Sequence, residues 1–327
     1  MQACGSADSH PRPEIELWFE LETGCNLACR FCYNFWKDGS APVPLRSATQ
    51  SVVSALRKLL GVVRCSQIAF SGGEPLLRQD LEEIIASISD YDVPAVVTTN
   101  GSLLTADRIR SLMGVGVRRY QVALHSHLAE THDMLSGGAS WKAAVKAMVL
   151  AREAGATVTP VFVATRLNMG HFPETVLLAA RLGMKRVVFN RFVPTGLGIR
   201  NRKEIGVPTD EELIPVVVEA NAVARQHSMR IELGVPIAIP GGSIEGLTQS
   251  ELTSCPVERG QRRWTLGSDL TLRRCNQSGN NIGSVMDDGL RELLSELEGA
   301  RDRGVPHHTS VRNCQILSSG LVAISVH

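Results

Sequence analysis

The chain reaches its first predicted strand and a cysteine-bearing loop in the stretch Ile15-Glu-Leu-Trp-Phe-Glu-Leu21-Glu-Thr-Gly-Cys25-Asn-Leu-Ala-Cys29-Arg-Phe-Cys32. The run Ile15–Leu21 is rich in residues that favour strands. Cys25, Cys29 and Cys32 follow it directly. This stretch begins the fold and also marks its first candidate site.

Repeated strand–helix units continue the pattern as far as residue 235. The predicted strands are Ile15–Leu21, Gln67–Ser71, Ala95–Thr99, Arg119–Leu124, Thr157–Ala164 and Arg186–Arg191. The predicted helices are Thr49–Leu60, Asp80–Ile88, Ala106–Met113, Trp141–Ala154, Phe172–Leu182 and Asp210–His227. This order predicts an α/β fold with a parallel sheet and right-handed crossovers. Six units suit a partial (β/α)6 barrel of the TIM type, with function at the C-terminal ends of its strands.

The composition of the sequence and its strand–helix pattern change after residue 235. The segment Ile237–Gly246 is rich in proline and glycine, and strand-like pieces follow at Trp264–Leu266 and Leu270–Arg273. A further amphipathic helix is predicted over Gly289–Ala300. We therefore divide the chain into a tail (1–13), a partial barrel (14–235) and a small C-terminal domain (236–327).

Composition limits the class of protein. Of 327 residues, 43% are hydrophobic, which supplies a packed core, and the formal net charge is only +1. That balance shows no excess of positive charge of the kind that binds nucleic acid. No apolar run approaches the roughly 20 residues of a membrane helix. The first residues lack a signal-peptide core, so we expect a cytoplasmic protein. Cytosolic thiols stay reduced, so its clustered cysteines are expected to bind metal or take part in chemistry.

The three clustered cysteines have two interpretations. Three thiolates on a short loop can hold three irons of a cubane cluster and leave one iron without a protein ligand. The alternative is a structural zinc loop, which normally requires a fourth cysteine or histidine nearby. Neither His10 nor Cys65 is a convincing fourth ligand by position. The spacing favours iron–sulfur.

The same spacing, with Phe31 before the third cysteine, resembles the radical S-adenosylmethionine (SAM) superfamily. Ser71-Gly72-Gly73-Glu74-Pro75 follows the second strand, where that superfamily places its Gly-Gly-Glu segment. There, Gly72 and Gly73 would let backbone carbonyls approach the methionyl ammonium of SAM, and Glu74 would supply an anionic acceptor. Thr98-Thr99-Asn100-Gly101 matches the ribose and methionine contacts of the family, which implicates Thr99 and Asn100.

Two further segments resemble the subgroup with a SPASM or Twitch auxiliary-cluster domain. They are Glu130-Thr-His-Asp-Met-Leu-Ser-Gly137 and Phe189-Asn-Arg-Phe-Val-Pro-Thr-Gly196. Downstream, the spacing of Cys255 and Cys275 also matches, and Cys314 is the third candidate ligand. The resemblance implies a second, auxiliary iron–sulfur cluster with a non-cysteine fourth ligand, an open iron, or a substrate atom on that iron. The alternative is that this cluster has been lost and the three are ordinary buried cysteines.

The chain departs from the family at the fourth strand. Ala123-Leu-His-Ser126 stands where relatives usually have Ser-Leu-Asp-Gly, and Ser136 replaces the usual arginine. Arg166, at the end of the fifth strand, could restore the lost contact to the SAM carboxylate, although a surface ion pair is an equal alternative. His125 adds a titratable group at a strand end as a catalytic or substrate-binding candidate, the alternative being a buried neutral histidine.

The resemblance implies that SAM binds the open iron and that one electron cleaves it to methionine and a 5′-deoxyadenosyl radical. Arg191 and Asn190, at the end of the sixth strand, suit a polar or anionic substrate, with Arg191 also a catalytic candidate. We expect a sugar-bearing small molecule of an antibiotic pathway, undergoing decarboxylation or dehydrogenation. Compact relatives such as cytosylglucuronate decarboxylases are the first comparison to make.

Three alternatives stay open at this point. One is an epimerase acting on the same class of substrate. The second is a maturase of ribosomal peptides, and the third is a non-catalytic iron–sulfur or zinc protein. For either enzyme we expect a flavodoxin or ferredoxin as electron donor, and neither nucleic acid nor membrane as a partner.

Overall fold

The computed structural model describes residues 13–39, 41–235, 237, 244, 263–277 and 281–294. Its first six strands are β1 (Glu14–Glu22), β2 (Arg64–Gly72), β3 (Ala95–Thr99), β4 (Arg119–Ala123), β5 (Thr157–Ala164) and β6 (Arg186–Arg191). Each strand pairs in parallel with the next. The sequence therefore predicted all six strands, three of them with the observed bounds.

A seventh strand, β7 (Arg230–Leu233), pairs in parallel with β6 and was not predicted. It has only four residues, and just Ile231 and Leu233 are buried, so the alternation is too short to be diagnostic. In the described part of the chain the strands form one ten-stranded sheet in the order β10-β9-β8-β1-β2-β3-β4-β5-β6-β7. The sheet therefore has two edges, β10 and β7, and forms an open arc.

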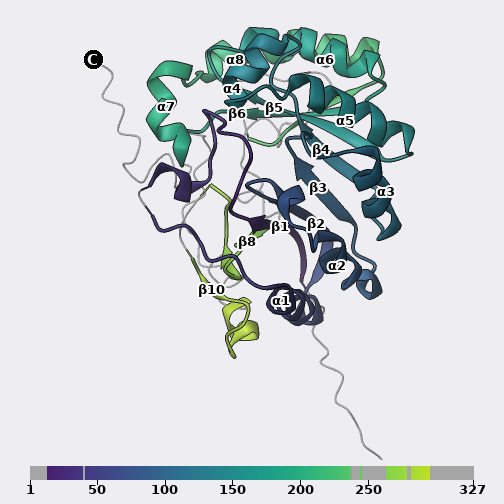
Figure 1. Cartoon of the computed structure of the whole chain (residues 1–327). Helices are drawn as coiled ribbons and strands as arrows, with labels where there is room; N and C mark the ends of the chain where they lie inside the picture. Colours follow the sequence, from purple (N-terminus) through teal and green to yellow (C-terminus); the bar gives the residue numbers. More distant parts are fainter. Residues whose placement is uncertain are drawn as a thin grey trace, which may run out of the picture.

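Helices connect the parallel strands, and most lie along one side of the curved sheet, whereas α7 lies apart from them (Figure 1). The helices are α1 (Thr49–Val62), α2 (Leu81–Ala86), α3 (Ala106–Gly114), α4 (Ala129–Ser136), α5 (Trp141–Glu153), α6 (Phe172–Arg181), α7 (Leu197–Ile205) and α8 (Asp210–Gln226). α4 and α7 were not predicted. In α7 only Gly198 and Ile205 are buried, so it lacks the apolar face that makes a helix visible in a sequence.

β1 separates the core from the inside of the arc. Its alternate residues Ile15, Leu17, Phe19 and Leu21 are each at most 1% exposed and belong to the main apolar core. Successive side chains of a strand point to opposite faces. Glu20 therefore points away from that core, and it forms a buried ion pair with Arg273.

The C-terminal part of the chain continues the same sheet. β8 (Arg263–Leu266) pairs in parallel with β1, and β9 (Thr271–Arg273) and β10 (Gly283–Ser284) follow as antiparallel strands. The sheet thus crosses the domain boundary expected at residue 236, and that division stays a prediction. Residues 290–294 are helical, and the rest of the helix predicted over 289–300 lies outside the described residues, as do Cys255 and Cys314.

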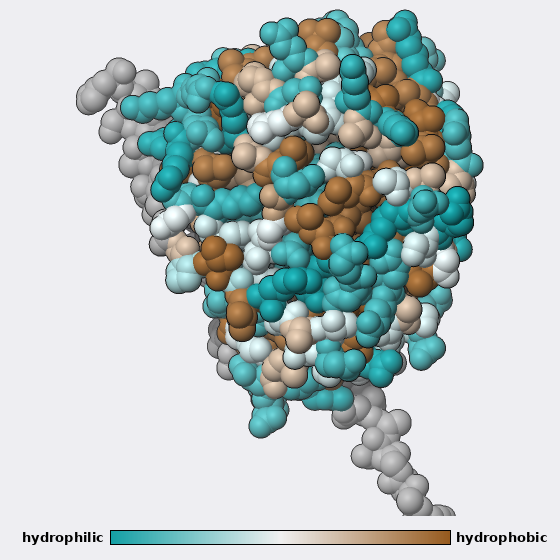
Figure 2. Space-filling view, in the orientation of Figure 1, coloured by the Kyte–Doolittle hydropathy of each residue, from teal (hydrophilic) through white to brown (hydrophobic). Residues whose placement is uncertain are grey.

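Hydrophobic and hydrophilic residues are interspersed on the face of the molecule shown in Figure 2. Two of the most exposed apolar side chains, Val43 (62%) and Leu45 (78%), belong to the segment before α1. A search of the described helices finds none that is long and apolar enough to span a membrane.

Candidate functional site

The three cysteines of the triplet lie in the loop that leaves the C-terminal end of β1. The Cys32 N–H donates to the Cys29 carbonyl at 3.1 Å, which closes a turn between two of the thiols. The pKa of Cys29 is raised to about 12, mainly by burial and then by the charges that Cys32 and Cys25 would carry. Ionised together, the thiolates would repel one another, so a cationic metal centre is what would stabilise them as a set.

A pair of glycines at the end of β2 holds the start of this cysteine loop. The Gly73 N–H donates to the Glu22 carbonyl at 2.6 Å. A Cβ on Gly73 would lie 1.9 Å from the Gly24 carbonyl oxygen, and one on Gly72 would lie 2.2 Å from that of Glu22. Backbone therefore packs directly on backbone, and only glycine fits. The Gly-Gly pair predicted to bind SAM also fixes the loop that carries the cysteines.

Glycines also hold the loop from its other side. Gly137, just after α4, has a φ of +69°, and a Cβ there would lie 2.4 Å from the Ala28 carbonyl oxygen. Gly198, in the first turn of α7, donates its N–H to the Cys32 carbonyl at 3.0 Å. The loop is therefore clamped from both sides by segments far apart in the sequence.

Glu74 is buried and bonded to the exit of β3. Its Oε1 accepts hydrogen bonds from Thr99 Oγ1 (2.7 Å) and the Leu76 N–H (3.1 Å), and its Oε2 accepts from the Asn100 N–H (2.8 Å). Burial raises the pKa of Glu74 to about 7 despite these hydrogen bonds. The structure brings three of the predicted SAM-binding residues, Glu74, Thr99 and Asn100, together. Both carboxylate oxygens are already engaged, and the contact of Glu74 with SAM stays a prediction.

Replacement of Glu74 by glutamine should be costly. The amide NH2 of Glu74→Gln would face an N–H donor of Leu76 or Asn100, leaving buried donors without an acceptor. We expect a loss of about 1–3 kcal/mol in the free energy of unfolding, measured by urea titration. Glu83→Gln, on the exposed side of α2, is the matched control and should change stability by less than about 0.5 kcal/mol. Equal stabilities of the two variants would contradict the prediction.

Asn26 joins the cysteine loop to the same strand end. Its Oδ1 accepts from Asn100 Nδ2 (2.9 Å), its Nδ2 donates to Ser102 Oγ (2.7 Å), and the Ser102 hydroxyl donates to Asn100 Oδ1 (2.6 Å). These bonds form a closed ring between the loop and the exit of β3. Asn26 was not among the predicted site residues, and its only signal in the sequence was its place between two cysteines.

His125, at the end of β4, lies against the cysteine loop. Its ring centroid is 4.5 Å from that of Phe31, and its side chain is buried. Nδ1 of His125 accepts from the Val163 N–H at 3.3 Å, and the backbone N–H of His125 donates to His132 Nδ1 at 3.1 Å. Burial, followed by the charge of His132, lowers the pKa of His125 well below its ordinary value. The structure thus holds His125 as a neutral, hydrogen-bonded histidine, and its role in catalysis or substrate binding stays a prediction.

The imidazoles of His125 and His132 are stacked, with their ring centroids 5.3 Å apart, and should make the stability of the protein depend on pH. Burial lowers the pKa of His132 to about 4, whereas an unfolded histidine titrates near 6.5. Below about pH 6.5 the unfolded chain therefore binds more protons, and stability falls as the pH drops towards 4. We expect His132 to account for a loss of roughly 2 kcal/mol between pH 7.5 and pH 5.

The variant His132→Asn isolates this effect, because its Oδ1 can still accept from the His125 N–H. Urea titrations at several pH values should show a shallower decline in the variant than in the wild type. Glu74 has the opposite effect. Its pKa in the folded protein is raised to about 7, so its protonation stabilises the folded state as the pH falls from 7 towards the lower pKa that Glu74 has in the unfolded chain. That contribution is common to both proteins and cancels in the comparison. Identical pH slopes would refute the assignment.

The two arginines predicted at strand ends both pair with the first turn of α8. Arg166 Nε lies 3.0 Å from each carboxylate oxygen of Glu212, which is the surface ion pair that was the alternative for this residue. Arg191 pairs with Asp210. Asn190, next to Arg191, packs against the glycine that follows β7. The contacts of Arg166 with SAM and of Asn190 and Arg191 with substrate stay predictions.

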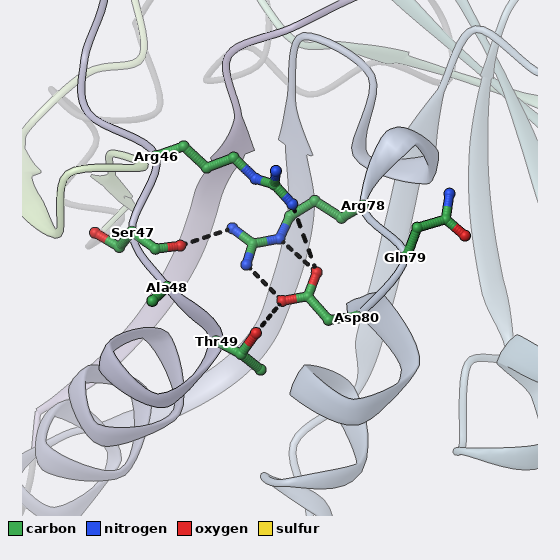
Figure 3. A pocket seen from close by; sticks show the side chains of 7 residues that line it. All are labelled: Arg46, Ser47, Ala48, Thr49, Arg78, Gln79 and Asp80. Atoms are coloured by element: carbon green, nitrogen blue, oxygen red, sulfur yellow. Dashed lines mark hydrogen bonds and ion pairs between the residues drawn. The ribbon is translucent and has the colours of Figure 1, made fainter.

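A pocket of about 390 Å³ lies near the exits of β1 and β2, and Figure 3 shows its side chains. Arg78 Nε and Nη2 bind Asp80 at 2.9 and 2.6 Å, and Arg46 lies 3.1 Å from Glu22. Glu22 in turn accepts from the Gly24 N–H at 2.9 Å. Both arginines of the pocket are thus neutralised within the protein. We infer that this network of ion pairs and hydrogen bonds stabilises the start of the cysteine loop.

Cys275 is the one C-terminal candidate ligand within the described residues, two residues after β9. β9 runs antiparallel to β8, and β8 runs parallel to β1. β9 itself therefore runs towards the N-terminal end of β1, away from the end that carries the triplet. The other two candidate ligands lie outside the described residues, so the auxiliary cluster stays a prediction.

Fold and site together define a partial α/β barrel whose first strand ends in a clamped three-cysteine loop. The family model described as the radical SAM superfamily matches residues 20–179. A PqqA peptide cyclase of Gluconobacter oxydans is 30% identical over 206 residues, 62% of this chain and 56% of that protein. A probable GTP 3′,8-cyclase of Aeropyrum pernix is 31% identical over 235 residues, 69% of this chain and 64% of that protein.

Among solved structures, SuiB of Streptococcus suis bound to S-adenosylmethionine matches 86% of this chain and 65% of its own, with a TM-score of 0.68 at 14% identity. This likeness confirms the predicted partial-barrel fold. The chain is thus similar to the radical SAM superfamily over slightly less than half of its length, and to relatives of the peptide-cyclase type. It spans 56% and 64% of the lengths of the two curated relatives.

The similarity to the radical SAM superfamily suggests a [4Fe–4S] cluster and SAM, and the residues present fit these groups. The loop presents three thiols in one clamped segment, as a cluster with an open iron requires. Within the described residues, no three cysteine, histidine or carboxylate side chains are grouped to hold a single metal ion. The buried side-chain oxygen of Asn34, two residues beyond the last thiol, accepts no hydrogen bond from the residues that the structure describes.

Proposed function

We propose that this chain is a radical SAM enzyme, in which Cys25, Cys29 and Cys32 hold a [4Fe–4S] cluster whose fourth iron binds SAM. When bound, these groups supply a one-electron cleavage of SAM whose product radical removes a hydrogen atom from a substrate C–H bond. The observation that carries the proposal is the glycine-clamped cysteine loop, joined by hydrogen bonds to the exits of β2 and β3.

The residues of the chain itself would hold the reacting groups in place and exclude water. The glycine contacts fix the backbone that carries the thiols, and the Glu74 network fixes the facing strand ends. The partly buried ring of Phe31, within the loop, packs against the buried imidazole of His125. Rigid positioning is what decides which substrate hydrogen is removed.

Two substrate classes are compatible with this site. The sequence suggested a sugar-bearing small molecule undergoing decarboxylation, dehydrogenation or epimerisation. The resemblance to cytosylglucuronate decarboxylases is a narrower form of the same hypothesis. We propose a peptide as the first class to test and a nucleotide-like small molecule as the second. One relative acts, by its name, as a peptide cyclase and another as a GTP cyclase, and Arg191, which suggested an anionic sugar, is engaged by Asp210.

The test of the chemistry is anaerobic reconstitution with iron and sulfide, followed by addition of SAM and dithionite. We expect 5′-deoxyadenosine and methionine to form in equal amounts, quantified by liquid chromatography. Absence of 5′-deoxyadenosine from a protein that has taken up iron would overturn the proposal.

Substrate class and electron donor need separate measurements. Peptides encoded beside the gene and nucleoside sugars are incubated in parallel, and mass spectrometry reports which one changes mass. Flavodoxin or ferredoxin, the donors expected in a cytoplasmic setting, should replace dithionite. An iron content near eight per chain would support the auxiliary cluster, whereas about four would remove it.

A further inference from the structure

α7 presents a row of charged side chains on the surface of the protein. Arg200, Arg202 and Lys203 are exposed, and so is Glu204. Only Gly198 and Ile205 of this helix are buried. A helix with so small an apolar face contributes little to a core, so other contacts must account for its place in the fold.

Hydrogen bonds to the backbone of the cysteine loop hold α7 in place. The Gly198 N–H donates to the Cys32 carbonyl at 3.0 Å, and Asn201 Nδ2 donates to the Arg30 carbonyl at 2.8 Å. The Arg30 side chain, in the loop itself, pairs with Glu204 of the helix. The helix therefore lies directly on the segment that ends at the last thiol of the triplet.

α7 also packs on the short 3-10 helix η1 (Phe35–Asp38), which follows the loop. A Cβ on Gly39, the residue after η1, would lie 3.4 Å from the Arg200 guanidinium. In Figure 1, α7 lies at the left of the molecule, apart from the helices along the curved sheet. The outer side of α7 is thus a separate surface, one helix away from the cysteine loop.

The charge of this surface is mainly positive. Arg30, Arg200, Arg202 and Lys203 contribute four positive charges and Glu204 one negative charge, which leaves +3, whereas the whole chain has a net charge of only +1. η1 adds one lysine and one aspartate, and so no net charge. We call these five residues the α7 face. Its excess of positive charge fits a partner with negative charge.

The proposed chemistry requires one electron to reach the cysteine loop from outside. A protein docked on the α7 face would be separated from the loop by the width of one helix, about 10 Å. That separation is short enough for electron transfer from a cofactor at the edge of the partner. The hydrogen bond from Gly198 to Cys32 also joins the helix backbone directly to a predicted cluster ligand. Positive charge at this point would steer an acidic partner to it and speed their association.

We propose that the α7 face is the docking surface for an acidic protein that carries single electrons. This inference rests on the proposed function and adds to it the place where the reductant binds. The reduced carrier is oxidised by one electron, and the oxidised cluster is reduced by the same electron. No bond is made or broken in this step, and no proton has to move.

The test uses the full reconstituted chain and an acidic flavodoxin in its hydroquinone form, with stopped-flow absorbance to follow reduction of the cluster. The double variant Arg202→Glu, Lys203→Glu reverses two charges of the α7 face. It should be reduced by the flavodoxin about tenfold more slowly than the wild type at low salt. The difference should shrink at high salt, where charges are screened. Reduction by photoreduced deazariboflavin, a small molecule that needs no docking surface, should be unchanged.

Two further double variants serve as controls. Lys142→Glu, Lys146→Glu makes the same change in net charge at two exposed positions of α5, and the flavodoxin should reduce it as fast as the wild type. Arg202→Gln, Lys203→Gln removes the charges without adding acidic groups and keeps residues that favour a helix. It should be slowed less than the reversed variant. Iron content and circular dichroism are measured for every variant, so that rates refer to folded, loaded protein.

A second measurement reports docking without turnover. A carbodiimide joins a lysine to a carboxylate that it contacts, and mass spectrometry identifies the linked peptides. We expect the flavodoxin to be crosslinked to Lys203 in preference to Lys142 and Lys146, which lie on α5. Crosslinks that form on α5 and not at Lys203 would contradict the proposal.

Failure of this inference can be told apart from failure of the proposed function. A wild type that holds its cluster but forms no 5′-deoxyadenosine with SAM and dithionite would overturn the proposed function. If the wild type is active with dithionite and the reversed variant accepts electrons from flavodoxin at the wild-type rate, only the docking inference is wrong. Equal slowing with both reductants would also overturn it, because the charges would then act on the cluster or the fold. So would a wild-type dimer that the charge reversal dissociates, because the α7 face would then join two copies of the chain.

Discussion

Cys29→Ala is expected to abolish both cluster binding and SAM cleavage. Cys29 is the middle thiol of the triplet, and its neighbours cannot hold a cubane cluster with only two irons ligated. The reconstituted variant should contain about four fewer iron atoms per chain than the wild type and form no 5′-deoxyadenosine. Iron analysis and liquid chromatography after addition of SAM and dithionite measure the two effects.

Cys65→Ala is the matched control, because Cys65 is also a partly buried cysteine with a pKa raised to about 12 by burial, but it lies at the start of β2. It should keep the iron content and the cleavage activity of the wild type. If Cys29→Ala retained the cluster, the assignment of the triplet would be wrong.

Gly73→Ala should be the most damaging single methyl group that can be added near the site. The new Cβ would lie 1.9 Å from the Gly24 carbonyl oxygen, so the backbones of the cysteine loop and the Gly-Gly turn must move apart. That movement breaks the hydrogen bond from the Gly73 N–H to the Glu22 carbonyl. We expect a loss of about 3 kcal/mol or more in the free energy of unfolding, together with poor cluster incorporation.

Gly61→Ala provides the opposite result in the same protein. Gly61 lies within α1, and a Cβ there would meet nothing within 4 Å. Gly61 is the second-to-last residue of α1. Alanine is favoured over glycine by about 1 kcal/mol in a helix interior and by less near an end, so this variant should be slightly more stable than the wild type. Urea titration of both variants measures the contrast. A Gly73→Ala protein as stable as the wild type would disprove the backbone clamp.

Much of the barrel could be predicted because each unit carries a strong local signal. β5 and β6 are rich in valine and phenylalanine and have ordinary strand length, and α6 has a clear apolar face. β7 has only four residues, too few to show a clear alternation of buried and exposed positions, and α7 buries only Gly198 and Ile205. The pairing of β8 with β1 joins residues that are about 250 positions apart, and no local sequence pattern predicts such a contact.

The motifs of the candidate site could be predicted from the sequence, whereas the hydrogen bonds and ion pairs of its side chains could not. The cysteine spacing and the Gly-Gly-Glu segment located the site, and the structure brings them together. Glu74 accepts hydrogen bonds from Thr99, Asn100 and Leu76 because two strand ends pack together. Likewise Arg166 meets Glu212 only because α8 begins beside β5. Spacing along a chain does not encode such partners.

The pairing of β1 with β8 has a consequence for biosynthesis. A ribosome delivers the cysteine triplet early, yet the outer edge of the strand before it acquires its partner only when residues 263–266 have emerged. Until then an apolar strand keeps one row of backbone groups open, which invites association with other chains. We therefore expect iron–sulfur assembly factors to act on the finished polypeptide, and nascent chains halted before residue 263 to depend on chaperones.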